Sequence, residues 1–338
     1  MHTHDEVRRR LLIEGTAAVA LLALGRQSVA AGTPSTSSRE SAGTAARSTG
    51  APRAASPAAA AGTITIGKDL VVNRLGFGAM RVTGEGIWGP PEDREAAIRL
   101  LRRVVELGVD FIDTADSYGP GTSEELIAAA LHPYPRGLVI ATKGGIVRPA
   151  REQWERDGRP QHLREACEAS LKRLRLERID LYQLHAIDPQ VPLEESLGEL
   201  SRLQKEGKIR HVGVSNFKAD ELERARRIVD VVSVQNRYNV ADRSSDPVLA
   251  ACERDGIAFI PWSPLSQGPR DAGAESRAKL EALAAKRGVS VPHAAVAWLL
   301  ARSKVMLPIP GTSKVKHLED NVAAAAMRLT PEEMREIG

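Results

Sequence analysis

The sequence predicts an α/β protein whose body is a (β/α)8 TIM barrel with an N-terminal β-hairpin. Eight short apolar runs lie between residues 75 and 309, and each is followed by a stretch with helical periodicity. Runs such as 138–141 and 257–260 are apolar at every position, which is typical of parallel strands covered by helices. A doubly wound sheet usually has fewer strands, so the barrel is favoured.

Residues 63–72 predict the hairpin, with its turn at 67–69. The first barrel strand is expected at 75–80, where glycines allow another segment to approach the backbone closely. Glycines after predicted helices and a proline before the last turn mark several boundaries. The other strands are expected at 109–114, 138–142, 179–185, 209–214, 231–235, 257–262 and 305–309. The helices are expected at 93–107, 122–131, 162–175, 193–206, 218–228, 246–255, 275–302 and 314–326.

The first 62 residues are expected to lie outside the barrel domain, which is assigned to residues 63–338. Residues 1–31 contain three arginines at 8–10, a short apolar stretch and small residues at 28–31, an order typical of a twin-arginine signal peptide. Glu14 interrupts the apolar stretch, so export is only slightly favoured over a cytoplasmic location. Residues 32–62 are rich in Ala, Ser, Gly and Pro and predict a disordered linker.

Composition and charge narrow the function classes. With 42% hydrophobic and 27% charged residues, the chain has the composition of a soluble globular protein. Most of its net charge of +4 arises in residues 1–62, which hold seven arginines and four acidic residues, and the nearly balanced body gives no support for nucleic-acid binding. Cys167 and Cys252 fall in predicted helices and are expected to be buried structural thiols, not metal ligands.

Four polar residues follow consecutive predicted strands, where a barrel places its active site. Asp113 and Tyr118 follow the second strand, Lys143 ends the third and His185 ends the fourth. Each alone has an ordinary structural explanation, but together they suit proton transfer. An ammonium lowers the pKa of a phenol, a carboxylate holds the ammonium, and a histidine can donate to a substrate oxygen. The set predicts a general acid for carbonyl reduction.

Later strand ends suggest a site for the hydride donor. Ser215, Asn216 and Gln235 offer hydroxyl and amide groups that could hold a carboxamide, and Trp262 offers a face for stacking a ring. The N-terminus of the helix after residues 309–313, with Lys314 and Lys316 beside it, predicts a phosphate site. A solvated helix face is the alternative for these two lysines.

The body resembles the aldo-keto reductase family from residue 64 to 338. Eight ordered motifs carry the resemblance, which is far more specific than a single pattern. They are residues 75–78 (Leu-Gly-Phe-Gly), 111–115 (Phe-Ile-Asp-Thr-Ala) with Tyr118, 141–143 (Ala-Thr-Lys), 181–185 (Leu-Tyr-Gln-Leu-His), 213–217 (Gly-Val-Ser-Asn-Phe), 234–236 (Val-Gln-Asn), 261–265 (Pro-Trp-Ser-Pro-Leu) and 309–312 (Ile-Pro-Gly-Thr). The resemblance implies NADPH lying extended over the carboxyl face of the barrel.

The resemblance also implies residue roles. Tyr118 would be the general acid, Lys143 and Asp113 its tuning pair, and His185 would orient the carbonyl. Ser215, Asn216 and Gln235 would hold the nicotinamide carboxamide. Trp262 would stack on its ring, where much of the family has tyrosine. Further cofactor contacts would come from Gly78, Met80, Ser263, Leu265, Gly311, Thr312, Ser313, Lys314, Lys316, His317, Asp320 and Asn321.

Two departures from the family concern the adenosine end of the cofactor. Well-studied members have lysine where Gly311 stands and arginine where His317 stands, which weakens the choice of NADPH and leaves NADH open. Lys314 and Lys316 could compensate for the missing charges.

Loop residues 87–91, 132–135 and 157–160 resemble the branch that includes pyridoxal reductases, so pyridoxal-like aromatic aldehydes are candidate substrates. Trp88 is expected to line the substrate pocket with Tyr118 and His185, surface packing being the alternative. A regulatory or interaction subunit that binds NADP with minor turnover is the competing function. The sequence leaves the oligomeric state open.

Overall fold

The computed structural model describes residues 56–265 and 274–338. The predicted signal peptide and residues 32–55 of the predicted linker lie outside the described residues. The end of that linker belongs to the folded body, because the 3-10 helix η1 (Pro57–Ala61) buries Ala58 and Ala61. Ala58 also donates its N–H to the Leu107 carbonyl at 3.1 Å. Nowhere in the two described ranges is a helix long and apolar enough to cross a membrane.

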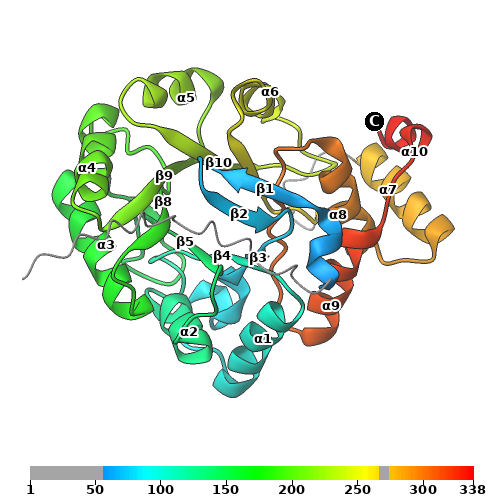
Figure 1. The fold of residues 1–338 in the computed structure, drawn as a ribbon, viewed down its shortest axis with the longest axis horizontal. Helices are drawn as coiled ribbons and strands as arrows, with labels where there is room; N and C mark the ends of the chain where they lie inside the picture. The colour runs from blue at the N-terminus through cyan, green and yellow to red at the C-terminus, as the bar shows by residue number, and fades with distance from the viewer. Residues whose placement is uncertain (1–55, 266–273) are drawn as a thin grey trace, which may run out of the picture. The chain divides into compact units, whose positions relative to one another are not determined.

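The predicted hairpin is present and covers one end of the barrel (Figure 1). It consists of β1 (Thr63–Ile66) and β2 (Leu70–Asn73), which pair antiparallel. Ile66 and Val72 are buried against barrel-interior residues that include Phe111 and Val139. Phe111 and Val139 are the first residues of their barrel strands, so the hairpin closes the amino-terminal end of the barrel. The carboxyl ends of the strands are left to the connecting loops.

Seven parallel strands form the barrel sheet in the order β11-β10-β9-β8-β5-β4-β3, so units that are consecutive in the sequence lie side by side. The first strand is shorter than predicted, because a 3-10 helix, η2 (Ala79–Val82), begins directly after Gly78. The strands are β3 (Phe77–Gly78), β4 (Phe111–Asp113), β5 (Val139–Gly144), β8 (Ile179–Leu184), β9 (Ile209–Ser215), β10 (Val231–Arg237) and β11 (Ala258–Trp262).

The predicted eighth strand closes the ring but is not a regular strand. Phe259 exchanges two backbone hydrogen bonds of 2.8 Å with residues 305–307, and on the other side Gly76 N donates to the Pro308 carbonyl at 2.9 Å. Pro308 and Pro310 have no N–H to continue a ladder, which explains why the expected strand at 305–309 is reduced to an isolated bridge.

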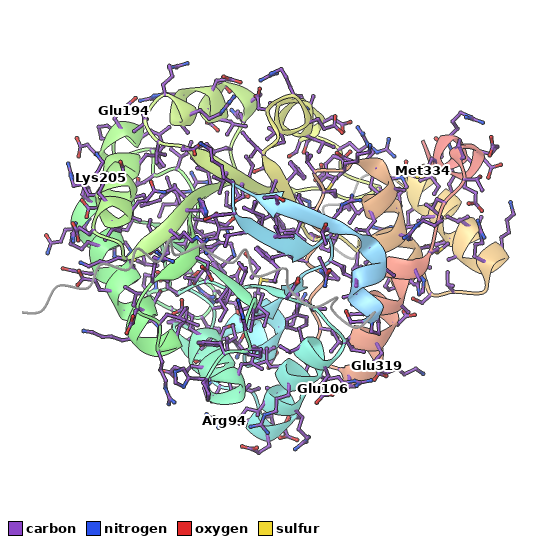
Figure 2. All side chains as sticks on the ribbon, viewed as in Figure 1. Arg94, Glu106, Glu194, Lys205, Glu319 and Met334 are labelled. Atoms are coloured by element: carbon purple, nitrogen blue, oxygen red, sulfur yellow. The ribbon has the colours of Figure 1, made fainter. Side chains whose placement is uncertain are left out.

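The helices surround this sheet (Figure 1), and charged side chains such as Arg94, Glu194 and Lys205 point outward from them (Figure 2). The predicted helix at 275–302 is wrong as a single element. Gly288 ends its first part with φ +65°, and the Ser290 side chain caps the second by accepting from His293 N. The helices are α1 (Arg94–Glu106), α2 (Thr122–Leu131), α3 (Pro160–Leu174), α4 (Leu193–Lys205), α5 (Ala219–Arg226), α6 (Asp246–Asp255), α7 (Ala274–Arg287), α8 (Val291–Arg302), α9 (Val315–Ala323) and α10 (Pro331–Ile337).

A small hairpin after β5 was not predicted. It pairs β6 (Ile146–Val147) with β7 (Glu155–Arg156). Strands of two residues carry too little hydrophobic pattern to be recognised in a sequence. The hairpin extends the loop that follows the third barrel strand, at the end of the barrel opposite β1 and β2.

Candidate active site

A buried ion pair joins the carboxyl ends of β4 and β5. Lys143 Nζ lies 2.7 Å from Asp113 Oδ1, and the two side chains are 0% and 3% exposed. The register places Asp113 beside Ala141, so Lys143 extends two residues beyond it and turns back to the carboxylate. This confirms the predicted contact between the two strands.

The polar groups of this ion pair are satisfied by hydrogen bonds. Lys143 Nζ also donates to the Thr114 carbonyl at 2.8 Å. Asp113 Oδ2 accepts from Gln183 Nε2 at 3.2 Å and from Gln235 Nε2 at 2.7 Å. A buried charge is tolerated only when it is paired and hydrogen-bonded, and these contacts supply that condition. Gln235, predicted to hold a carboxamide, therefore has an amide already bonded inside the barrel.

Tyr118 lies against the ammonium, as predicted. Its hydroxyl is 3.5 Å from Lys143 Nζ, and its ring centroid is 5.1 Å from the same atom. The predicted lowering of the phenol pKa is wrong in this structure. Burial raises the pKa of Tyr118 above its ordinary value, and the attraction of Lys143 opposes that rise without overcoming it. The phenol therefore keeps its proton at neutral pH and can donate it.

His185 faces the edge of the Tyr118 ring, with ring centroids 6.0 Å apart. Burial, followed by repulsion from the Lys143 ammonium, lowers the pKa of His185 well below its ordinary value. The imidazole is therefore neutral at neutral pH. Its Nδ1 lies 3.4 Å from Ser117 Oγ. A hydrogen bond accepted there places the ring proton on Nε2, where it can be donated to a substrate oxygen.

A second buried carboxylate network, not predicted from the sequence, joins α2, α3 and β5 next to Lys143. Glu124 on α2 is completely buried and accepts from Thr142 Oγ1 and Arg173 Nε, both at 2.6 Å. Asp116 Oδ1 is enclosed and has no hydrogen-bond partner within the described ranges. Burial, and then the charge of Glu124, raise the pKa of Asp116 to about 8. Asp116 is thus protonated at neutral pH.

The residues predicted to hold the nicotinamide form a second group next to His185. Asn216, whose φ is +62°, donates from Nδ2 to the His185 carbonyl and to Ser215 Oγ, each at 3.0 Å. Trp262 Nε1 donates to Asn216 Oδ1 at 3.1 Å. Ser215 Oγ donates to the Gln235 carbonyl at 2.9 Å. Ser215, Asn216 and Trp262 are therefore brought together at the ends of β9 and β11, whereas Gln235 joins them only through its backbone carbonyl, because its amide is bonded to Asp113.

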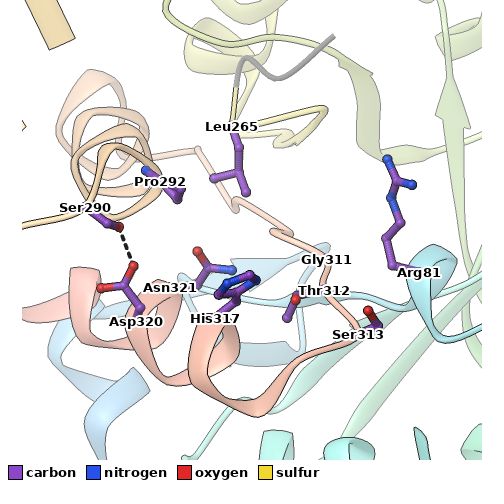
Figure 3. A pocket seen from close by; sticks show the side chains of 10 residues that line it. All are labelled: Arg81, Leu265, Ser290, Pro292, Gly311, Thr312, Ser313, His317, Asp320 and Asn321. Carbon is purple, nitrogen blue, oxygen red and sulfur yellow. Dashed lines mark hydrogen bonds between the residues drawn. The ribbon is translucent and has the colours of Figure 1, made fainter. Parts of the chain in front are cut away.

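A cavity of about 540 Å³ lies between the start of α9, the start of α8 and η2 (Figure 3). Seven of the predicted cofactor residues line it, which supports the grouping inferred from the motifs. Arg81, Ser290 and Pro292 also line it and were missed. The predicted residues that line it are Leu265, Gly311, Thr312, Ser313, His317, Asp320 and Asn321, with Leu265 coming from the segment that follows β11.

Two backbone segments approach each other closely beside this cavity, and glycine at positions 78 and 311 leaves room for the contact. A Cβ on Gly78 would lie 2.7 Å from the Ile309 carbonyl oxygen, and one on Gly311 would lie 2.5 Å from the Gly78 carbonyl oxygen. The segment that the first strand was expected to approach is therefore 309–311. A side chain at position 311, such as the lysine of well-studied family members, would require this backbone contact to widen.

Polar groups of opposite charge line the two sides of the cavity. Arg81 is exposed and enters it from η2, opposite Ser290 and Pro292 (Figure 3). Asp320 accepts a hydrogen bond from Ser290 Oγ and lies 3.3 Å from His293 Nδ1. Hydroxyls, an amide, an imidazole and a guanidinium are donors suited to a nucleotide and its phosphates, so the residues present fit such a group.

The remaining predicted residues lie beside the cavity. Lys314 and Lys316 are exposed at the start of α9 and do not line it. Met80 is half-buried on η2, and the backbone carbonyl of Ser263, a residue with φ +53°, accepts from Asn239 Nδ2 at 3.0 Å.

Trp88 is half-buried in the loop after η2 and lies against Arg148. Both cysteines are buried as predicted, and burial raises the pKa of each thiol to about 12. No cluster of metal ligands occurs in the part of the chain that the structure describes.

Three comparisons with known proteins agree. The model of the Aldo/keto reductase family matches residues 74–338. An uncharacterized oxidoreductase of Schizosaccharomyces pombe is 51% identical over 275 residues, which cover 81% of this chain and 88% of that protein. Pyridoxine 4-dehydrogenase of Escherichia coli is 40% identical over 277 residues, covering 80% and 95%. A Klebsiella pneumoniae aldo/keto reductase in complex with NADP and acetate has a TM-score of 0.69 at 26% identity, covering 81% and 93%.

Proposed function

Because the chain belongs to the aldo/keto reductase family of oxidoreductases, we propose that it reduces aldehydes to alcohols with NADPH, and that Tyr118 is the proton donor. The observation that carries this proposal is the contact of a buried, protonated phenol with a buried ammonium–carboxylate pair. Bound NADPH would supply the hydride. The protein's own residues would bind the carbonyl oxygen and give it a proton.

The roles of the four residues follow from their contacts. His185 donates from Nε2 to the carbonyl oxygen and fixes its position, because the imidazole is neutral and held through Nδ1. Tyr118 transfers its proton to the same oxygen as negative charge develops there. Burial disfavours the phenolate that this transfer leaves, and the Lys143 ammonium, 3.5 Å away, stabilises it. Asp113 keeps the lysine charged and in place.

The cofactor would be held by two groups of residues. Ser215, Asn216 and Trp262 would bind the nicotinamide end near His185, since they already form one hydrogen-bonded group there. The cavity at α9 would receive the adenosine and phosphate end. We propose NADPH over NADH because Arg81 adds a positive charge to that cavity. The complex of the Klebsiella relative with NADP supports the same choice.

Pyridoxal-like aromatic aldehydes are the proposed substrate class. The 40% identical E. coli relative is a pyridoxine 4-dehydrogenase, and two tryptophans, Trp88 and Trp154, lie on loops that follow barrel strands. The test is NADPH consumption against a panel of carbonyl compounds that includes pyridoxal, with NADH as the paired control. Saturable turnover of aromatic aldehydes supports the proposal. Slow, non-saturating NADPH oxidation with a co-purifying membrane partner would instead indicate a regulatory subunit.

We also propose that the chain is exported by the twin-arginine route, on the order of features in residues 1–31. This route carries folded proteins, so a tightly bound cofactor could travel with the chain. Fractionation of cells into cytoplasm and periplasm tests this proposal independently of the activity.

A further inference from the structure

Arg148 occupies an unusual position beside the proposed active site. Arg148 directly follows β6 and is only 8% exposed. In each of its hydrogen bonds it donates to a backbone carbonyl. Its five N–H groups donate to five carbonyls, so the guanidinium has no donor left to bind an anion. The acceptors are Gln153 O at 3.0 Å, Ile87 O at 3.1 Å, Ser117 O at 3.4 Å, Gly86 O at 3.2 Å and Arg151 O.

Those carbonyls belong to the loops that follow the first three barrel strands. Gly86 and Ile87 lie after β3, Ser117 lies after β4, and Gln153 lies in the hairpin after β5. Ser117 precedes Tyr118, and its hydroxyl lies 3.4 Å from His185 Nδ1. Arg148 is therefore connected to the proposed proton donor and to the histidine through a single residue.

Two tryptophans cover the guanidinium. Its Cζ lies 3.7 Å from the Trp154 ring centroid and 5.4 Å from the Trp88 ring centroid. We call Trp88, Arg148 and Trp154 the rim cluster. Trp154 is 42% exposed although it is large and aromatic, so part of its surface is open to a ligand.

The backbone beside Trp88 is strained, which indicates that the loop is held in place. Ile87 has φ +57°, an outlier for a β-branched residue that persists only when its surroundings enforce it. Its carbonyl accepts from both Arg148 Nη1 and Gly119 N, at 3.1 Å each. Gly119 follows Tyr118, so the strained residue links the rim cluster to the catalytic loop.

We infer that Arg148 is a positioning residue that joins the three loops into one wall, and that Trp154 on this wall selects flat aromatic aldehydes. The inference rests on the proposed function and refines its substrate class. Lysine could not replace Arg148, because an ammonium has three donors and no plane to stack between two rings. Trp154 would act by stacking on the substrate ring.

The first experiment measures how firmly the three loops are held together and does not depend on enzyme turnover. Hydrogen–deuterium exchange is followed in residues 84–90 and 148–156 for wild type, Arg148→Gln and Arg148→Lys. Both variants should exchange these amides about tenfold faster, because at least two loop contacts are lost. Arg94→Gln, an exposed arginine on α1 paired with Glu95, is the matched control and should exchange like wild type. Unchanged exchange in Arg148→Gln would overturn the positioning role.

The second experiment compares benzaldehyde with butanal. Trp154→Ala should lower the ratio of kcat/KM for benzaldehyde to kcat/KM for butanal about fivefold, because the KM for benzaldehyde rises. The kcat values and the NADPH Kd should stay unchanged, and Trp154→Phe should restore the ratio. A ratio that stays within about twofold of wild type in Trp154→Ala overturns the selecting role. If wild type reduces neither aldehyde, the proposed function and the selecting role both fail, while the exchange experiment still decides the role of Arg148.

Discussion

Neutralising Asp113 is the perturbation that most clearly separates stability from catalysis. In Asp113→Asn the Lys143 ammonium keeps the Thr114 carbonyl at 2.8 Å but loses its carboxylate at 2.7 Å, while both side chains stay buried. Removing one partner of a buried ion pair costs about 3–5 kcal/mol, because an uncompensated charge remains. Turnover should fall about a hundredfold, since the phenolate of Tyr118 loses a correctly held cation.

The double variant Asp113→Asn with Lys143→Met tests the cause. With both charges removed, at least half of the lost stability should return, whereas activity should stay low. The assay is urea unfolding followed by circular dichroism and by tryptophan fluorescence, whose transitions must coincide for a two-state analysis. Glu319→Gln is the matched control, because the exposed pair of Glu319 with Arg103 should be worth less than about 1 kcal/mol.

Two outcomes would refute this reasoning. The first is an Asp113→Asn variant that is no less stable than Glu319→Gln, since the buried pair would then carry no special cost. The second is a double variant whose loss of stability equals the sum of the two single losses. Such additivity would mean that Asp113 and Lys143 do not interact energetically.

Three further predictions concern the cavity and the buried acid. Arg81→Gln should weaken NADPH binding about tenfold by losing a charge-assisted phosphate contact, measured by quenching of protein fluorescence; an affinity within about twofold of wild type would contradict that role. Gly311→Ala should lower the unfolding free energy by about 1–3 kcal/mol, because its Cβ would lie 2.5 Å from the Gly78 carbonyl; an unchanged urea midpoint would count against that contact. Asp116 has a raised pKa, so wild-type stability should fall as pH rises from its ordinary pKa of 3.8 to about 8. Asp116→Asn should flatten this slope, which is at most about 1.4 kcal/mol per pH unit, and an unaltered profile would exclude Asp116 as its source.

The barrel and the four residues at its mouth could be predicted because their signals are local. Apolar runs alternate with helical periodicity, and Asp113, Lys143 and His185 each end such a run. Gln183, which donates to Asp113, was missed, although it lies two residues before His185, which directly follows β8, and an extended chain puts such residues on the same face. A polar residue within an apolar strand was the available signal.

Other features could not be predicted because they depend on the packing of distant segments. The pKa of Tyr118 depends on burial as well as on Lys143, and burial was not visible in the sequence. The rim cluster depends on Arg148 reaching backbone carbonyls of three loops, which leaves no pattern of side chains to recognise. Arg81 enters the cavity from η2, a 3-10 helix that was not predicted and whose first two residues were assigned to the strand at 75–80.

The central claim is that Tyr118 gives the proton, and Tyr118→Phe tests it most directly. This change removes one hydroxyl and leaves the ring, the Asp113–Lys143 pair and the cavity in place. The measurement is aldehyde reduction together with the NADPH Kd from protein fluorescence. Turnover should fall by at least about a hundredfold while the Kd stays within about twofold of wild type. Aldehyde reduction at a near wild-type rate would contradict the claim.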